Sequence, residues 1–233
     1  MSGFRVVFED DHLLVIDKPA GLVVHPARGH REGTLAQLLE GVAAGGDPTR
    51  AGIVHRLDRG TSGLLIVARS EEAHRRLQAA IAAREVQREY LALVQGHPPS
   101  RSGTIEAPIG RDPRIRTRMA VGGRFSREAR THFTLERVVG AFSLLKLRLE
   151  TGRTHQIRVH LQAIGYPVVG DPEYGAAGLL GLERQFLHAT RLAFRHPISG
   201  ADIELHSELP PDLQTALERA PDRVVPTRTS DRR

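Results

Sequence analysis

Residues 55–69 read HRLDRGTSGLLIVAR, a polar loop that runs into a compact apolar segment. The apolar run 63–68 has the length and composition of a buried strand, and the small residues before it are typical of a tight turn. A turn at the end of a rigid strand can hold a carboxylate in a cleft, so Asp58 is a candidate functional residue. The alternative is that Asp58 only pairs with Arg56 or Arg59, or caps the turn.

The rest of the chain predicts strands and helices that do not alternate strictly. Apolar and β-branched residues predict strands at 4–9, 12–17, 63–68, 89–94, 131–138, 142–149, 185–194 and 203–206. Helical spacing of apolar residues, with capping residues such as Ser70, predicts helices at 34–42, 70–84, 154–164 and 212–219. This pattern predicts an α+β fold around a mostly antiparallel sheet. We expect one domain over residues 1–220 and a polar, disordered tail over 221–233.

The composition excludes several classes of function. None of the 233 residues is a cysteine, which excludes disulfides, thiol nucleophiles, cysteine-ligated zinc and iron–sulfur clusters. His155 and His160 fall on different faces of a helix and no HExxH motif occurs, so we expect no metal. No apolar stretch approaches the roughly 20 residues needed to span a bilayer. The N-terminus has no secretory core, so we expect a cytoplasmic protein without membrane contact.

The charge distribution favours nucleic acid as the partner. The formal net charge is +6, and most of the basic excess is arginine, whose planar fork suits phosphate. Residues 111–137 hold eight arginines against three acidic residues, a local excess of +5. We expect this segment, with a flexible Gly122-Gly123, to be an arm that grips phosphates through Arg114, Arg116 and Arg118. The alternative is a solvated, charged loop. An aromatic content of 4% is too low for the stacking platforms of non-specific single-strand binders.

Five blocks of the sequence, taken together, match the motifs of one enzyme family. The stretch 55–69 follows KPAGLVVHP at 18–26, and the two have the form of an active-site signature. REYLALV at 88–94 corresponds to a tyrosine motif and TGRTHQIRVHL at 151–161 to an arginine motif, and DPEYG at 171–175 and LHA at 187–189 match as well. In this order and at this spacing, the blocks resemble the RluA family of pseudouridine synthases.

The resemblance implies both an architecture and a reaction. The architecture is a bent, mixed sheet, mostly antiparallel and flanked by helices and loops, with a cleft between two halves of one catalytic domain. Many members carry an amino-terminal S4 RNA-binding module, for which we expect no counterpart here because the first hairpin begins at residue 4. In the reaction the bond between uracil N1 and C1′ breaks, the base turns, and C5 joins C1′. Since nothing is oxidised or transferred between molecules, we expect no cofactor.

The matching motifs imply roles for three side chains in this chemistry. Asp58 is implied as the catalytic carboxylate, and whether it attacks C1′, attacks the uracil ring or deprotonates C2′ stays open. Arg158 is the candidate guanidinium that keeps Asp58 ionised; the alternative is a solvated helix arginine beside the apolar stripe. Tyr90 would hold the extruded base and move a proton; the alternative is a half-buried strand tyrosine.

Further residues of these motifs are implied to bind RNA. Arg56 is at the position implied to fill the gap left by the flipped uridine, and Arg59, Arg153 and His155 are additional candidates for RNA contacts. The segment 21–26 is more similar to the ribosomal large-subunit branch than to the tRNA branch, and we expect a monomer. Two other functions stay open. One is a catalytically idle RNA-binding or ribosome-assembly factor, and the other is an N-glycosidase in which water captures C1′.

Overall fold

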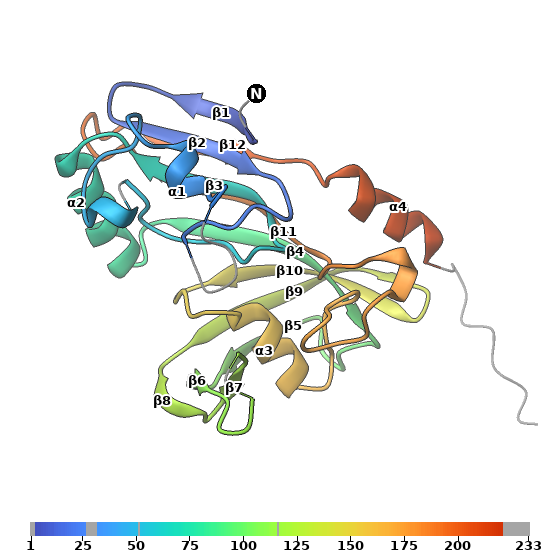
Figure 1. Cartoon of the computed structure of the whole chain (residues 1–233). Helices are drawn as coiled ribbons and strands as arrows, with labels where there is room; N and C mark the ends of the chain where they lie inside the picture. The colour runs from blue at the N-terminus through green and yellow to red at the C-terminus, as the bar shows by residue number, and fades with distance from the viewer. Residues whose placement is uncertain (1–2, 27–31, 51, 116, 221–233) are drawn as a thin grey trace, which may run out of the picture.

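A mostly antiparallel sheet forms the centre of the molecule (Figure 1), whose computed structural model describes residues 3–26, 32–50, 52–115 and 117–220. Within these residues, nine strands pair in the order β1-β2-β3-β11-β4-β10-β9-β5, with β12 added to β11. They are β1 (Arg5–Glu9), β2 (Leu13–Lys18), β3 (Ser62–Ala68), β4 (Gln87–Gln95), β5 (Ser102–Glu106), β9 (Arg130–Val139), β10 (Phe142–Leu149), β11 (Leu187–Arg195) and β12 (Asp202–His206). Among the pairings of these nine strands, only that of β3 with β11 is parallel. The predicted α+β class and mixed sheet are therefore confirmed, whereas the tail predicted at 221–233 lies outside the described residues.

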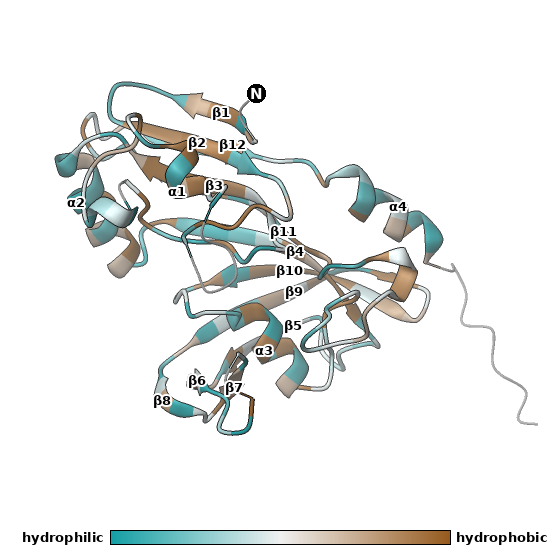
Figure 2. Ribbon diagram, in the orientation of Figure 1, coloured by the Kyte–Doolittle hydropathy of each residue, from teal (hydrophilic) through white to brown (hydrophobic). Residues whose placement is uncertain are grey.

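The two faces of the sheet are both covered near β2 and β3. Leu14 and Ile16 belong to the larger hydrophobic core, and the alternate residues Leu13 and Val15 belong to a second core on the other face. Every residue of β3 is buried, as expected for a strand enclosed on both sides. Figure 2 shows the hydrophobic residues concentrated on these strands. The loop that carries Asp58 is thus attached to the most enclosed part of the fold.

One glycine fixes how closely β3 approaches its parallel neighbour. Gly63 pairs with Ala189 of β11 and has a φ of +109°. A Cβ atom there would lie 2.2 Å from the carbonyl oxygen of Ala189. Because no side chain fits such a gap, glycine is required where the Asp58 loop enters the sheet.

Four helices flank the sheet in the described part of the chain: α1 (Leu35–Leu38), α2 (Glu71–Ala82), α3 (Gln156–Ala163) and α4 (Pro211–Arg219). Figure 1 shows α1 and α2 beside β2 and β3, and α3 in the other half of the molecule near β9. The predicted cap of α2 is confirmed, because Oγ of Ser70 accepts a hydrogen bond from the backbone N–H of Ala73. The predicted helix 34–42 was too long: the helix ends before Gly41, whose φ of +79° is not helical. None of these helices is long and apolar enough to cross a membrane.

The prediction that Gly122-Gly123 is a flexible point of the arginine-rich segment was wrong, whereas the predicted role of this segment as an arm that grips phosphates stays a prediction. Its central part forms a small sheet of β6 (Ile109–Arg111), β7 (Met119–Val121) and β8 (Arg124–Arg127), and residues 130–137 belong to β9. Gly122-Gly123 is the turn between β7 and β8. It is tightly packed, since a Cβ on Gly123 would lie 2.5 Å from the carbonyl oxygen of Arg111. Met119 packs in a small hydrophobic cluster with Val159 of α3, which ties this sheet to the main body.

Candidate active site

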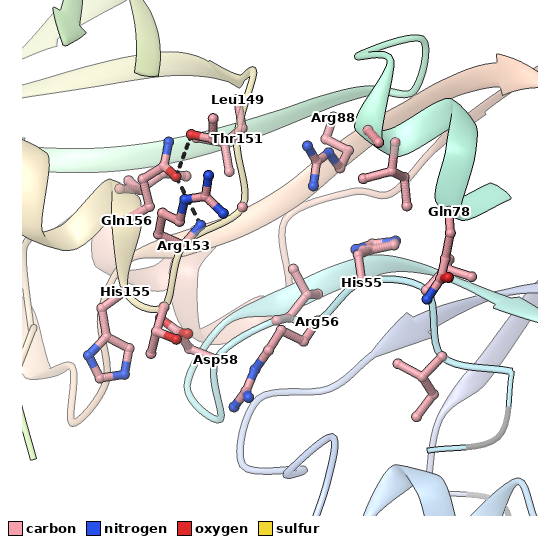
Figure 3. Close-up of a pocket in the computed structure, with 18 of the residues that line it drawn as sticks. His55, Arg56, Asp58, Gln78, Arg88, Leu149, Thr151, Arg153, His155 and Gln156 are labelled. Atoms are coloured by element: carbon pink, nitrogen blue, oxygen red, sulfur yellow. Dashed lines mark hydrogen bonds between the residues drawn. The ribbon is translucent and has the colours of Figure 1, made fainter. Parts of the chain in front are cut away.

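A cleft of about 870 Å³ runs between the two halves of the main sheet. Its lining comes from the loop before β3, from the adjacent faces of α2 and β4, and from the segment 149–157 that leads into α3. Figure 3 shows Arg153 and His155 on one side of this space and His55 and Gln78 on the other, with Asp58 and Arg56 between them in this view. Sequence positions about 100 residues apart therefore meet here, as a functional cleft requires.

The loop that carries Asp58 is held rigidly from behind. The backbone N–H of Thr61 donates to the carbonyl oxygen of Asp58 over 3.0 Å, closing the predicted tight turn. Arg184 donates to the carbonyl oxygen of Gly60 over 2.9 Å, and Gln185 donates to the hydroxyl of Thr61 over 3.1 Å. Together these bonds fix the turn to the segment before β11.

Lys18 is a buried residue that also holds the Asp58 loop in place, a role that the sequence analysis did not predict. Its Nζ donates to the carbonyl oxygens of Pro19, Leu22 and Arg59, so the ammonium joins the KPAG segment to the Asp58 loop. Burial lowers the pKa of Lys18 to about 7, although the nearby carboxylate of Asp58 acts in the opposite direction. In the sequence Lys18 only marks the polar end of an apolar strand. This position gave no reason to predict a structural role for its side chain.

The predicted contact between Arg158 and Asp58 exists. Nη1 of Arg158, on α3, lies 3.2 Å from Oδ2 of Asp58. The helix was expected to leave Arg158 at the edge of its apolar stripe, but the residue is only 4% exposed. The correction has a clear reason, since carboxylates other than Asp58 also bind the guanidinium and hold it inside the protein.

Two of these carboxylates, Asp171 and Glu173, were missed. Asp171 is fully buried and accepts two hydrogen bonds from Arg158, at 2.7 and 2.9 Å, and Glu173 accepts a third at 2.7 Å. The guanidinium also lies 4.9 Å from the ring centroid of Tyr174. Burial alone would lower the pKa of Arg158, but the hydrogen bonds that it donates to Asp171 and Glu173 and the charge of Asp58 raise the pKa above its ordinary value. Arg158 is therefore permanently charged and fixed in one orientation.

Tyr90 lines the same cleft from β4. The residue is 5% exposed, so it is more deeply buried than the half-buried strand tyrosine of the alternative, and it belongs to the larger hydrophobic core as well as to the cleft lining. Burial raises the pKa of its phenol, and the nearby charge of Asp58 adds to this effect while Arg88 opposes it. The hydroxyl group is accordingly protonated at neutral pH and can donate a hydrogen bond.

The loop 151–155 brings two further predicted residues to the cleft. Gln156 organises this loop, because its Oε1 accepts from the hydroxyl of Thr151 at 2.8 Å and from the backbone N–H of Arg153 at 3.0 Å (Figure 3). His155 has a φ of +55° immediately before α3, so the helix begins two residues later than predicted. Its Nδ1 lies 2.9 Å from the hydroxyl of Tyr174. Burial lowers the pKa of His155 despite the neighbouring Asp58, which favours a neutral ring.

The other predicted RNA contacts are distributed unevenly. Arg56 is exposed and lines the cleft. Arg59, Arg114 and Arg118 are not among its lining residues: Arg59 donates to the carbonyl oxygen of Gly21 at 3.4 Å, and the other two lie between β6 and β7. Arg116 lies outside the described residues. No group of three histidine, aspartate or glutamate side chains that could hold a metal occurs among residues the structure describes.

Comparison with known proteins agrees with this geometry. The sequence pattern of the family described as RNA pseudouridylate synthase matches residues 12–163. The chain belongs to the RNA pseudouridylate synthase family. An RNA pseudouridine synthase of Chloroflexus aurantiacus is 55% identical over 213 residues, which cover 89% of this chain and 66% of the relative. A ribosomal large subunit pseudouridine synthase D of Zymomonas mobilis is 46% identical, over 90% of this chain and 70% of the relative.

Solved structures support the same family. The chain superposes on human RNA pseudouridylate synthase domain containing 1 with a TM-score of 0.71 and 28% identity, over 92% of this chain and 88% of the human one. The predicted family and fold are thus confirmed. The family's matched region contains Asp58, Tyr90 and Arg158, whereas Asp171 and Glu173 lie beyond its end at residue 163. The curated relatives above are longer, since this chain spans about two thirds of their length.

Proposed function

We propose that this protein converts uridine to pseudouridine in RNA, with Asp58 as the catalytic carboxylate. The observation that carries the proposal is the ion pair of 3.2 Å between Asp58 and Arg158 inside the cleft. Arg158 reaches only Oδ2 of Asp58, and Oδ1 accepts no hydrogen bond from the described parts of the chain. One oxygen is therefore oriented by the protein, and the other is available to the substrate.

Each of the three possible routes requires an ionised Asp58. The three routes use the carboxylate at C1′, at the uracil ring or on the proton at C2′, and a neutral acid could perform none of these steps. The permanently charged Arg158 favours the ionised form of its neighbour. Tyr90 supplies a flat ring against the extruded base and a protonated hydroxyl that can move a proton at C5 or C2′. Arg56, exposed at the cleft, is placed to occupy the gap in the RNA stack.

We further propose ribosomal RNA of the large subunit as the substrate. The support is that several relatives, including the one from Zymomonas mobilis, are named ribosomal large subunit pseudouridine synthase D. The net charge of +6 and the arginine-rich segment fit a polyanionic partner. With such a substrate the protein would act in the cytoplasm, and we propose that it does so as a monomer.

Release of tritium from RNA labelled at uracil C5 tests the reaction, because joining C5 to C1′ displaces that hydrogen. We expect wild type to release tritium, Asp58→Asn to release none, and Asp202→Asn to behave as wild type. Asp202 is a matched control, since its carboxylate pairs with Arg195 but is 89% exposed on β12. If wild type releases no tritium from any cellular RNA fraction, the enzyme proposal fails. If Asp58→Asn matches wild type, the role of Asp58 fails.

The products separate the proposal from its alternatives. Mapping of pseudouridine in ribosomal RNA from a strain lacking the protein should show one or more missing sites. Free uracil with abasic RNA would instead indicate an N-glycosidase. Binding of ribosomal RNA without any change in its uridines would indicate a catalytically idle RNA-binding factor.

A further inference from the structure

Arg88 is a buried arginine of the cleft for which the reaction scheme has no role. It lies on β4 two residues before Tyr90 and is only 5% exposed. Its guanidinium makes no hydrogen bond or ion pair with the residues that the structure describes, and its Nε is fully buried without a partner. Since Nη1 and Nη2 are neither bonded nor fully buried, they remain open to the cleft that Arg88 lines. A buried cation without a counter-charge is costly, so such a group indicates a missing anionic partner.

His55 beside Arg88 cannot supply that partner. Its Nε2 accepts a hydrogen bond of 3.0 Å from the backbone N–H of Ile66, so the ring proton is on Nδ1. Burial and the charge of Arg88 lower the pKa of His55 to about 3, which keeps the ring neutral. Nδ1 is also buried without a partner. Figure 3 shows the two side chains facing the same space, where both offer donors and neither offers an acceptor.

The carboxylate of Glu150, in the same lining, is already engaged. It accepts hydrogen bonds from Arg84, Arg130 and His132. On another side the backbone of Gly152 closes over the guanidinium, since a Cβ there would lie 3.3 Å from Nη1 of Arg88. The guanidinium is therefore enclosed and directed into the cleft.

We propose that Arg88 binds one backbone phosphate of the substrate RNA, beside the uridine that Tyr90 contacts. This inference rests on the proposed function. Residues i and i+2 of a strand lie on the same face, about 6.7 Å apart. Arg88 can therefore bind a phosphate while Tyr90 contacts the base of the same nucleotide. A phosphate supplies the missing negative charge and matches the fork of the guanidinium, whereas the carbonyl oxygens of uracil are neutral.

Replacement of single phosphates by uncharged methylphosphonates tests this contact directly. The probe is an RNA hairpin that contains the uridine mapped in the deletion strain, with each linkage near it replaced in turn. We expect wild type to lose about tenfold in affinity at one linkage, and Arg88→Met to show no further loss there. Arg195→Met, which removes an exposed arginine of β11, should keep the wild-type pattern. If wild type and Arg88→Met lose affinity equally at every linkage, the proposal is overturned.

Two further measurements separate binding from a structural role. The slope of log affinity against log salt should fall by about 0.7–0.9 in Arg88→Met, as expected for one lost phosphate contact, and Arg88→Lys, which retains the charge, should keep the slope. In the absence of RNA, Arg88→Met should raise Tm, because it removes an unpaired buried charge. A lower Tm would show that the guanidinium stabilises the fold and would overturn the proposal. If no uridine is mapped, the proposed function has failed, and the salt slope with ribosomal RNA still tests Arg88.

Discussion

Replacement of Asp171 by asparagine tests how much this buried carboxylate stabilises and orients Arg158, because the substitution leaves Asp58 itself unchanged. The carboxylate of Asp171 is fully buried, accepts two hydrogen bonds from Arg158, and accepts two more on Oδ1 from the backbone N–H groups of Glu173 and Tyr174. An asparagine that keeps its oxygen at the Oδ1 position retains the backbone bonds. It then turns an NH₂ group toward Nε of Arg158, where two donors meet.

The expected loss follows from which bonds remain. Breaking an isolated buried ion pair costs about 3–5 kcal/mol, but Arg158 keeps Asp58 and Glu173 as partners. The variant should then lose about 2–3 kcal/mol of its free energy of unfolding. This is the value of one charge-assisted hydrogen bond plus the cost of placing the asparagine NH₂ group against Nε of Arg158. For a chain of this size that lowers Tm by about 4–12 °C. Because Arg158 also orients Asp58, kcat should fall by about tenfold or more at temperatures where the variant is folded.

The assay is urea denaturation of wild type, Asp171→Asn and Asp212→Asn. Asp212 is the matched control, since it accepts two hydrogen bonds from Arg184 in the same geometry but is 48% exposed. Exposed pairs contribute about 1 kcal/mol or less. If Asp171→Asn costs no more free energy of unfolding than Asp212→Asn, the reasoning about Arg158 is wrong.

The pH dependence provides a second check on the same pair. Burial raises the pKa of Asp171, but the hydrogen bonds and charge of Arg158 outweigh it and hold the pKa below its ordinary value. In the unfolded chain the pKa is about 3.9. As the pH falls, Asp171 is therefore protonated in the unfolded state before it is protonated in the folded state. The stabilisation of the fold by ionised Asp171 is complete well above about pH 4, and it is lost as the pH falls through the lower native pKa. The difference in stability between wild type and Asp171→Asn should be constant near neutrality and should narrow on acidification.

Two other substitutions test the fold and the arginine-rich sheet. Gly63→Ala should cost more than about 3 kcal/mol in urea denaturation, because its Cβ would overlap the backbone of β11. Gly165→Ala, at a φ of +87° with nothing within 4 Å, should cost only about 1–2 kcal/mol, and equal losses would contradict the steric argument. Phe125→Ala, at a 93% exposed aromatic of β8, should leave stability within about 0.5 kcal/mol. Its RNA affinity in a filter-binding titration should fall about fivefold or more if the ring stacks on a base, and an unchanged affinity would exclude such stacking.

The main sheet could be predicted from the sequence because its strands are apolar and periodic. The strands β2, β3 and β10 bury most of their residues and were found within one or two positions. The small sheet was missed because its strands have only three or four residues, two of them contain arginine, and every residue of β8 is exposed. Close backbone contacts of Gly110 and Gly123 build it instead, and such contacts leave no hydrophobic pattern in a sequence.

The candidate site shows the same limit of local patterns. The meeting of Asp58 with Arg158 followed from the family resemblance, since neither strand nor helix periodicity relates positions so far apart. Periodicity placed Arg158 at the margin of an apolar stripe, and only the tertiary contact with Asp171 explains its full burial. Likewise, Lys18 ends a strand in the sequence, and its three carbonyl partners come from a loop and a turn that only the folded chain brings together.

The distribution of charge in the cleft bears on how a nucleotide enters it. Around Arg158 there are three carboxylates to one guanidinium, so the neighbourhood of Asp58 carries excess negative charge. Six arginines line the cleft, and none of them is Arg158: Arg50, Arg56, Arg84, Arg88, Arg127 and Arg153. Phosphates are repelled by the first group and attracted by the second. We therefore expect the neutral base to be the part of the nucleotide that approaches Asp58, while the backbone stays with the arginines. A guanidinium without a partner among the described residues, as that of Arg88 is, gains most from a phosphate held in that position.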